Sequence, residues 1–255
     1  MLLLVTDTSG RDGFVGLVRA SEDAQPANID VIEEVPLAGG TFSAQLVPQI
    51  AALLEKHGFR KTDIAAFIVV SGPGSFTGLR VGLAAIKALA EILHRPIVAV
   101  SVLEVLAPYS HMIAAIHKMP DGLEVLRYAV ALDASRGDAF VGEYELVIAE
   151  NGENSSRGIG ESLRRVDDLA ALLESGSIQW IATPDQAIFD ALRGRVSESK
   201  KRSVRRNLRR PRCEEIALVG RKKLAAGETV SPEQLEANYI RCSDAEIFSK
   251  PATGS

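Results

Sequence analysis

The sequence contains few aromatic residues and few cysteines. Only 5% of its 255 residues are Phe, Trp or Tyr, so aliphatic side chains must form most of any core, as is typical of α/β proteins. The two cysteines, Cys213 and Cys242, form no metal or redox motif, which favours a reducing, intracellular compartment. There is no signal-like N-terminal segment and no apolar run long enough to cross a bilayer. We therefore expect a cytoplasmic protein without membrane contact.

Catalytic signatures are also missing. The chain contains no His-Glu-x-x-His motif and no convincing Ser–His–Asp arrangement, so we predict no peptidase site and no metal. His111 and His117 are six residues apart, which is not a helical ligand spacing. The net charge of −4 excludes a molecule that binds nucleic acid through its overall charge.

The most informative stretch is a glycine-rich motif, Ser71-Gly-Pro-Gly-Ser-Phe-Thr-Gly-Leu-Arg80. An apolar run with the character of a buried strand precedes it, at 64–70, and a helix is expected at 79–93. Backbone N–H groups at such a helix start favour anions, but the glycine spacing fits neither a Walker A motif nor a dinucleotide-binding motif. A tight turn with close packing is the favoured interpretation.

The expected helix 79–93 has apolar residues around most of its circumference, and many of them are small. Such a helix is buried on more than one side. It either packs between its own sheet and a neighbouring helix, or turns one side to another subunit, and composition does not separate the two.

The order of predicted elements indicates a ribonuclease-H-like half followed by a second, related half. The expected strands of the first half are 1–6, 14–18, 29–35, 64–70 and 96–100, and its helices are 44–57, 79–93 and one from about 101. The second half is expected to have strands 125–132, 139–148 and 178–182, a loop at 151–160, and helices 166–173, 184–192 and 214–226. The predicted division is 1–110 and 111–255.

Polar turns follow the first strand of each half. Asp7, Thr8 and Ser9 follow strand 1–6, and Asp133 follows strand 125–132. Hydroxyl and N–H groups there could converge on a phosphate, so these four residues are candidates for nucleotide binding. Ordinary turn chemistry uses the same residue types and is the favoured alternative for the first turn.

Residues 193–212 form a basic segment, with ten Lys or Arg residues and one Glu. One interpretation is a solvated loop, because its few apolar residues cannot bury much surface. The other is an electrostatic arm for RNA phosphates, without base stacking, since no aromatic residue is interleaved. The candidate RNA-contacting residues are Arg202, Arg205, Arg206 and Arg209.

Several motifs together resemble the TsaB (YeaZ) family, which takes part in making N6-threonylcarbamoyladenosine in tRNA. The glycine motif with its continuation to Leu83 is the most specific of them. The supporting motifs are Asp7-Thr-Ser9, Ser43-x-x-Leu46-x-Pro48-x-Ile50, Ala131-Leu-Asp-Ala-Ser-Arg-Gly137, Tyr239-Ile-Arg241 and Asp244-Ala-Glu246. Two features depart from the family pattern: Phe42 replaces a usual His, and Thr183-Pro-Asp-Gln186 replaces a glycine-rich turn.

The resemblance implies an actin-like ATPase (ASKHA) fold, an α/β architecture of two ribonuclease-H-like halves with mixed sheets. It also implies a non-catalytic subunit. The catalytic relative, TsaD, carries two metal-binding histidines where this chain has Val102 and Leu106, and aliphatic side chains offer no ligand to a metal.

Family members pair with TsaD, or with themselves, through helices of the first half. That implies a contact at 44–57 and 79–93, through Leu46, Ile50, Leu53, Thr77, Arg80, Leu83, Ala84 and Lys87. The expected partners are a TsaD-like catalytic subunit, a TsaE-like ATPase, tRNA through the complex, and a second copy of the chain in a homodimer. No cofactor is required, although weak binding of ATP or ADP is compatible with the fold. The alternative function is a free-standing ATPase or phosphotransferase of the same superfamily.

Overall fold

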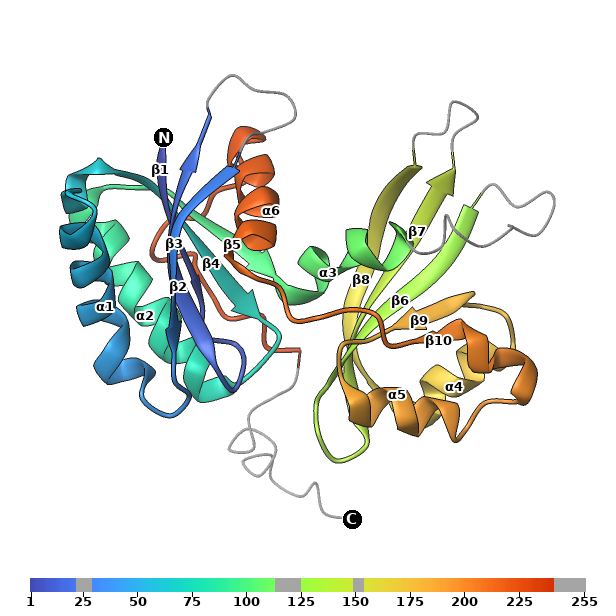
Figure 1. Cartoon of the computed structure of the whole chain (residues 1–255). Coiled ribbons are helices and arrows are strands. Elements are labelled where there is room, and N and C mark those ends of the chain that lie inside the picture. The colour runs from blue at the N-terminus through green and yellow to red at the C-terminus, as the bar shows by residue number, and fades with distance from the viewer. Residues whose placement is uncertain (22–28, 113–124, 149–153, 241–255) are drawn as a thin grey trace, which may run out of the picture. The chain divides into compact units, whose positions relative to one another are not determined.

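The computed structural model describes residues 1–21, 29–112, 125–148 and 154–240. The chain forms two compact units (Figure 1). The first unit contains Met1–Val102 and the chain from Pro211 onward, and the second is Leu103–Arg210. These units differ from the predicted division at 110 because the chain returns to the first unit after the basic segment. Within the described residues, no helix combines the length and the apolar character needed to span a membrane.

The first unit is built on a mixed five-stranded sheet with the order β3-β2-β1-β4-β5. Strand β1 pairs antiparallel with β2 and parallel with β4, while β2–β3 is antiparallel and β4–β5 is parallel. The strands are β1 Leu2–Asp7, β2 Gly13–Ala20, β3 Ile29–Leu37, β4 Ile64–Gly72 and β5 Ile97–Ser101.

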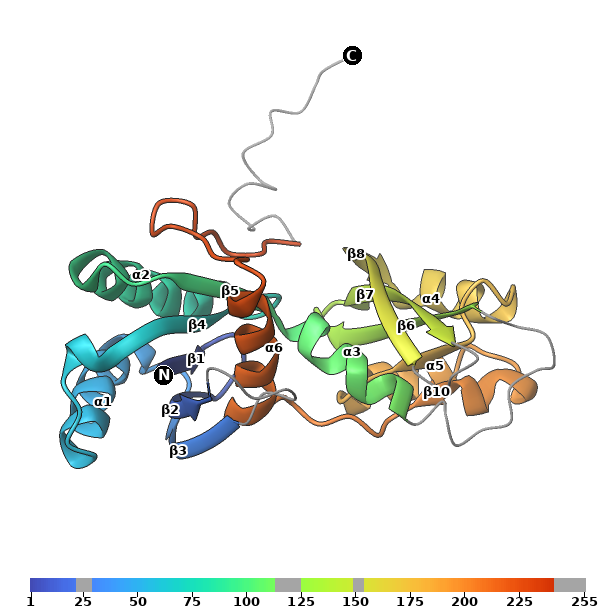
Figure 2. The same cartoon turned by 90° about the horizontal axis from the view of Figure 1, so that it is seen from above.

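Helices cover both faces of this sheet, as Figures 1 and 2 show. Helices α1 (Phe42–Lys56) and α2 (Phe76–Leu93) cover one face, and α6 (Cys213–Ala225) covers the other. The alternation of β4 places its side chains accordingly: Phe67 and Val69 join the core under α1 and α2, whereas Ile68 meets Gly220 of α6. A short 3₁₀ helix, η1, covers Lys61–Asp63.

The second unit repeats the same topology. Its sheet order is β10-β9-β6-β7-β8, with antiparallel β6–β7 and β7–β8 pairs and parallel β6–β9 and β9–β10 pairs. This duplication confirms the predicted actin-like α/β fold of two ribonuclease-H-like halves. The elements are α3 Val102–Met112, β6 Val125–Asp133, β7 Asp138–Ile148, β8 Asn154–Arg165, α4 Val166–Glu174, β9 Trp180–Ala182, α5 Gln186–Arg193, η3 Glu198–Ser203 and β10 Val204–Arg205.

Two predictions about local structure are wrong. The expected loop at 151–160 falls largely within strand β8, which pairs with β7 along its whole length. Its glycines suggested a loop, but backbone pairing does not need side chains, and a register shift at Glu143 and Tyr144 accommodates the segment. The basic segment also buries more than expected, because Val196 and Val204 belong to the core of the second unit.

Candidate partner-binding site

The glycine motif brings helix α2 against the end of strand β1. An added Cβ at Gly74 would lie 2.2 Å from the Ser9 carbonyl oxygen, and one at Gly78 would lie 2.1 Å from the Thr8 carbonyl oxygen. At Gly82 it would lie 2.2 Å from Thr8 Oγ1. Gly78 and Gly82, four residues apart, therefore mark the side of α2 that touches the turn after β1, in agreement with the close-packing interpretation.

Asp7, Thr8 and Ser9, the candidate phosphate-binding residues of the first unit, are all buried in this contact. The Ser9 backbone N–H and hydroxyl both donate to Asp7 Oδ1, at 2.8 and 2.7 Å. The Ser9 carbonyl oxygen in turn accepts the Ser75 N–H at 2.7 Å, at the N-cap of α2. These hydrogen bonds join the turn after β1 to the start of α2. Packing within the first unit therefore accounts for the positions of Asp7 and Ser9 without a ligand.

Asp133 lies in the corresponding turn of the second unit. Its side chain is exposed and accepts the Ser135 N–H at 2.8 Å, while its own N–H donates to Asp185 Oδ2 at 2.8 Å. Arg210 donates to both oxygens of Asp185, at 3.3 and 3.4 Å. The Asp133 N–H is therefore already bonded to a carboxylate of the chain itself.

The chain after α6 returns along helix α2. The Asn238 N–H donates to the Ser71 carbonyl oxygen at 2.8 Å. Gly72, with φ of +134°, lets this segment approach, since an added Cβ would lie 3.0 Å from the Asn238 carbonyl oxygen. Residues 235–239 thereby form one wall of a groove, and α2 forms the other.

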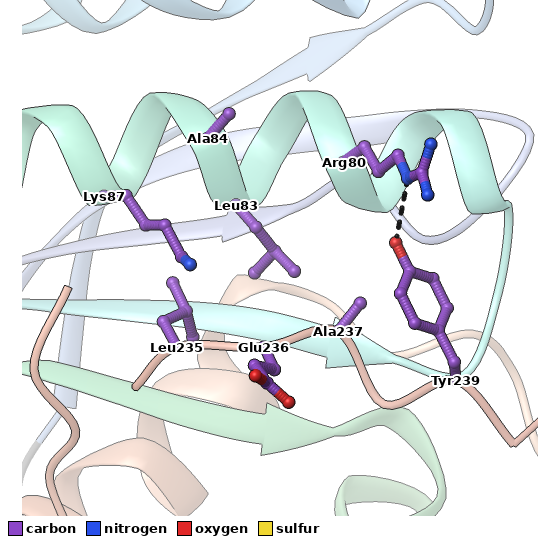
Figure 3. Close-up of a pocket in the computed structure, with 8 residues that line it drawn as sticks. All are labelled: Arg80, Leu83, Ala84, Lys87, Leu235, Glu236, Ala237 and Tyr239. Atoms are coloured by element: carbon purple, nitrogen blue, oxygen red, sulfur yellow. Dashed lines mark hydrogen bonds between the residues drawn. The ribbon is translucent and has the colours of Figure 1, made fainter. Parts of the chain in front are cut away.

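This groove has a volume of about 430 Å³ and is shown in Figure 3. Its α2 wall consists of four of the eight predicted partner-contact residues, and the opposite wall was not predicted as part of a site. The lining residues are Arg80, Leu83, Ala84, Lys87, Leu235, Glu236, Ala237 and Tyr239.

An aromatic and cationic cluster closes one end of the groove. The Arg80 guanidinium lies 3.7 Å from the centroid of the Phe76 ring, and its Nε donates to the Tyr239 hydroxyl at 3.2 Å (Figure 3). The Phe76 and Tyr239 rings are 5.1 Å apart between centroids. A cation over a ring face and an aromatic pair each contribute on the order of 0.5–1 kcal/mol at a surface. The cluster therefore stabilises the position of residues 235–239, one wall of the groove, against α2.

Burial separates the predicted contact residues into two groups. Leu46, Ile50 and Leu53 are at most 3% exposed and pack in the core of the first unit, so the expectation that they face a partner is corrected. Leu83 is 5% exposed, packs in the same core and lines the floor of the groove. Leu46, Ile50 and Leu53 recur at i, i+4 and i+3 along α1, and such an apolar pattern marks the core-facing side of a helix. The other four residues are accessible: Thr77, Arg80 and Ala84 are exposed, and Lys87 is half-buried.

The outward sides of α1 and α2 carry mostly small or apolar residues that were not selected from the sequence. Val47 is 50% exposed and Ile92 is 72% exposed, and alanines lie between them on both helices. We call this surface the α1–α2 face. Its exposed small or apolar residues are Ala44, Val47, Pro48, Ala51 and Ala52 of α1, and Thr77, Ala84, Ala88 and Ile92 of α2. The same helices also expose Ser43, Glu55, Lys56, Arg80 and Glu91.

The remaining site predictions concern the second unit and metal ligands. Arg202, Arg205, Arg206 and Arg209 all lie in the second unit, with Arg202, Arg206 and Arg209 exposed and Arg205 half-buried. Val102 and Leu106 of α3 are buried aliphatic side chains. Among the described residues, no group of three or more His, Cys, Asp or Glu side chains could hold a metal ion.

Comparison with known proteins identifies relatives of this fold and sequence. The family model described as "TsaD: tRNA N6-adenosine threonylcarbamoyltransferase" matches residues 36–247. The TsaB protein of Bacillus subtilis (strain 168) is 28% identical over 96% of both chains. That of Escherichia coli (strain K12) is 28% identical over 77% of this chain and 79% of its own. A solved structure from Pseudomonas aeruginosa, described as similar to peptidase YeaZ, is 25% identical with a TM-score of 0.65, covering 94% of this chain and 99% of its own.

The protein is thus an actin-like α/β protein of the family that the TsaD model describes. The chain belongs to this family, and its full-length similarity to TsaB and YeaZ proteins identifies it with the TsaB (YeaZ) members. The resemblance to the TsaB (YeaZ) family, inferred from several motifs together, is confirmed.

Proposed function

We propose that this chain is a non-catalytic subunit of the machinery that makes N6-threonylcarbamoyladenosine in tRNA. Its TsaB relatives are biosynthesis proteins of this modification, which supports a place in the same pathway. In this proposal a TsaD-like subunit performs the transfer, a TsaE-like ATPase joins the complex, and the present chain supports the catalytic subunit.

The observation that carries the proposal is the α1–α2 face. A helix pair that leaves Val47 and Ile92 exposed among alanines has apolar area to bury against a partner. The small side chains let partner helices approach closely, and the groove beside Ala84 can accept a larger side chain from the partner. In this proposal the same face serves a homodimer when the catalytic partner is absent. The homodimer and the complex with the TsaD-like subunit therefore compete for one surface.

The turns of the two units support a subunit without nucleotide chemistry of its own. Ser9 and Thr8 are packed against α2, and the Asp133 N–H is held by Asp185. In a free-standing ATPase or phosphotransferase these groups would be available to phosphates. Any ATP or ADP binding by the isolated chain is therefore expected to be weak.

Reconstitution of the modification tests this proposal. The organism's TsaD-like and TsaE-like proteins are incubated with substrate tRNA, with and without this chain, and threonylcarbamoyladenosine is measured. Activity only in the presence of the chain, with none from the chain alone, is the expected result. If modification is indifferent to the chain while the purified protein hydrolyses ATP or phosphorylates a metabolite, the alternative function is correct.

A further inference from the structure

The basic segment 193–212 is part of the folded second unit up to Arg210. Val196 and Val204 are 7% and 4% exposed and anchor it in the core. The Ser197 N–H and hydroxyl donate to Glu174, at 2.5 and 3.1 Å, and β10 pairs with β9 at the edge of the sheet. The cations are therefore presented on a fixed backbone, which lowers the entropy cost of binding through them.

Part of this charge is already neutralised within the unit. Arg195 pairs with Asp167 at 2.5 Å, Arg210 pairs with Asp185 at 3.3 Å, and Lys201 pairs with Glu198. These three cations stabilise the local fold, so they are poor choices for testing a ligand.

Another part of the charge has no counter-ion. Within the part of the chain that the structure describes, Lys200, Arg202 and Arg206 form no ion pair, and the two arginines are exposed. Arg205, between them, lies over the Trp180 ring at 5.4 Å from the centroid, and its Nη1 is buried without a hydrogen-bond partner. The segment thus presents unneutralised positive charge around strand β10.

We propose that this segment binds the phosphate backbone of RNA, with Arg202 and Arg206 as principal contacts. Eight of its ten cations are arginines, whose planar guanidinium binds phosphate with two parallel hydrogen bonds. The inference rests on the proposed function, which supplies tRNA as the ligand. It assigns to this subunit a direct contact with the tRNA.

The composition of the surface favours RNA over an acidic protein partner. Protein interfaces have an apolar, well-packed centre, but Val196 and Val204 are buried inward and Leu208 is half-buried. Nucleic-acid interfaces are more polar and more positive than protein interfaces. No aromatic residue occurs in 193–212, so the contact recognises the charge of the phosphates and not the identity of the bases.

Salt-dependent tRNA binding tests the proposal. Fluorescence anisotropy with labelled tRNA gives the affinity of the full chain between about 50 and 200 mM KCl, where counterion release dominates. The test variant is Arg202→Ala with Arg206→Ala. The control is Arg11→Ala with Lys61→Ala, which removes two exposed cations of the first unit and the same net charge.

Each phosphate contact contributes about 0.7–0.9 to the slope of log affinity against log salt. The test variant is expected to lose about 1.4–1.8 of that slope and to bind more weakly, while the control keeps the slope of the native chain. An unchanged slope in the test variant overturns the proposal, and so does an equal loss in both variants. A variant that binds tRNA normally but no longer binds the TsaD-like subunit would make the segment a protein contact instead.

The reconstituted modification separates this inference from the proposed function. If the chain is required but the Arg202→Ala, Arg206→Ala variant restores the native rate and tRNA affinity at every salt concentration, the proposed function stands and the RNA surface is wrong. If modification never needs the chain, the proposed function is wrong whatever the anisotropy shows.

Discussion

Alanine at Gly82 tests whether the glycines of α2 are needed for packing on β1 and not for an anion. A Cβ at Gly82 would lie 2.2 Å from Thr8 Oγ1 and 3.2 Å from Thr8 Cβ and Cγ2. A Cβ at Gly78 would lie 2.1 Å from the Thr8 carbonyl oxygen. The first clash is chiefly with a side chain and the second with the backbone, so substitution of Thr8 relieves only the first.

The magnitudes follow from two opposing effects. Alanine stabilises a helix interior by up to about 1 kcal/mol relative to glycine, whereas overpacking costs about 1–3 kcal/mol. Gly82→Ala should therefore destabilise the native chain by up to about 2 kcal/mol. In a Thr8→Ala background the Oγ1 and Cγ2 atoms are gone, and Gly82→Ala should be neutral or slightly stabilising. Gly78→Ala should cost about 1–3 kcal/mol in both backgrounds.

Urea unfolding followed by far-ultraviolet circular dichroism measures these differences in a double-mutant cycle. A coupling of about 1–3 kcal/mol, the overpacking that Thr8→Ala relieves, is expected between positions 8 and 82, and almost none between positions 8 and 78. The cycle cancels the cost of Thr8→Ala itself. Equal costs of Gly82→Ala in both backgrounds, or a harmless Gly78→Ala, would show that close packing is not the reason for these glycines.

Three further predictions address the face, the groove and a surface ion pair. Ala84→Arg should weaken binding to the TsaD-like subunit about 10- to 100-fold in calorimetry, since it places a charge on an apolar contact. The control Ala171→Arg, on the exposed side of α4, should leave this binding unchanged. Equal effects of the two variants would exclude the α1–α2 face as the partner contact. Tyr239→Phe removes the acceptor of the Arg80 hydrogen bond and should lower the free energy of unfolding by about 0.5–1 kcal/mol, and no change in urea would mean that the cluster does not hold the groove wall. Hydrogen bonds from Lys56, and to a smaller extent from His57, lower the pKa of Glu33 from its usual 4.5. The stability that Glu33 contributes is therefore present above its pKa in the unfolded chain, and it is lost as pH falls through its pKa in the folded chain. Glu33→Gln should accordingly be less stable near neutral pH and match the native chain in acid, and a difference that persists below pH 3 or so would contradict this.

The fold was largely predictable because its signals are local. The run at 64–70 and the helix after it are continuous apolar stretches with turn residues at their ends, and strand β4 and helix α2 follow them closely. The alternation of strands and helices then limits the topology, because parallel neighbours need a crossover. Helix α2 begins at Phe76, three residues before the expected start, since the Ser75 hydroxyl accepts the Gly78 N–H and caps it.

The site was less predictable because it depends on contacts distant in sequence. Tyr239 reaches Arg80 across 159 positions, and the return of the chain from Pro211 to the first unit leaves no local signature. The family resemblance placed Leu46, Ile50 and Leu53 at a contact, but they recur at helical spacing, and such an apolar side is the one that a helix buries. Most residues of the proposed α1–α2 face are small, and an apolar periodic pattern does not select them.

The turns after β1 and after β6 both have polar groups that are satisfied within the chain, but the contacts that satisfy them differ. In the first unit, the turn after β1 is packed by α2, whose glycines bring the helix within contact of Thr8 and Ser9. In the second, the turn after β6 is held by a carboxylate, as Asp185 accepts the Asp133 N–H and is itself neutralised by Arg210. Each arrangement satisfies, within the chain, polar groups that would otherwise be free for a phosphate. Val47 of α1 and Ile92 of α2 are among the exposed large apolar residues, and the proposed function assigns them to a partner contact, whereas a nucleotide enzyme needs open turns for its ligand.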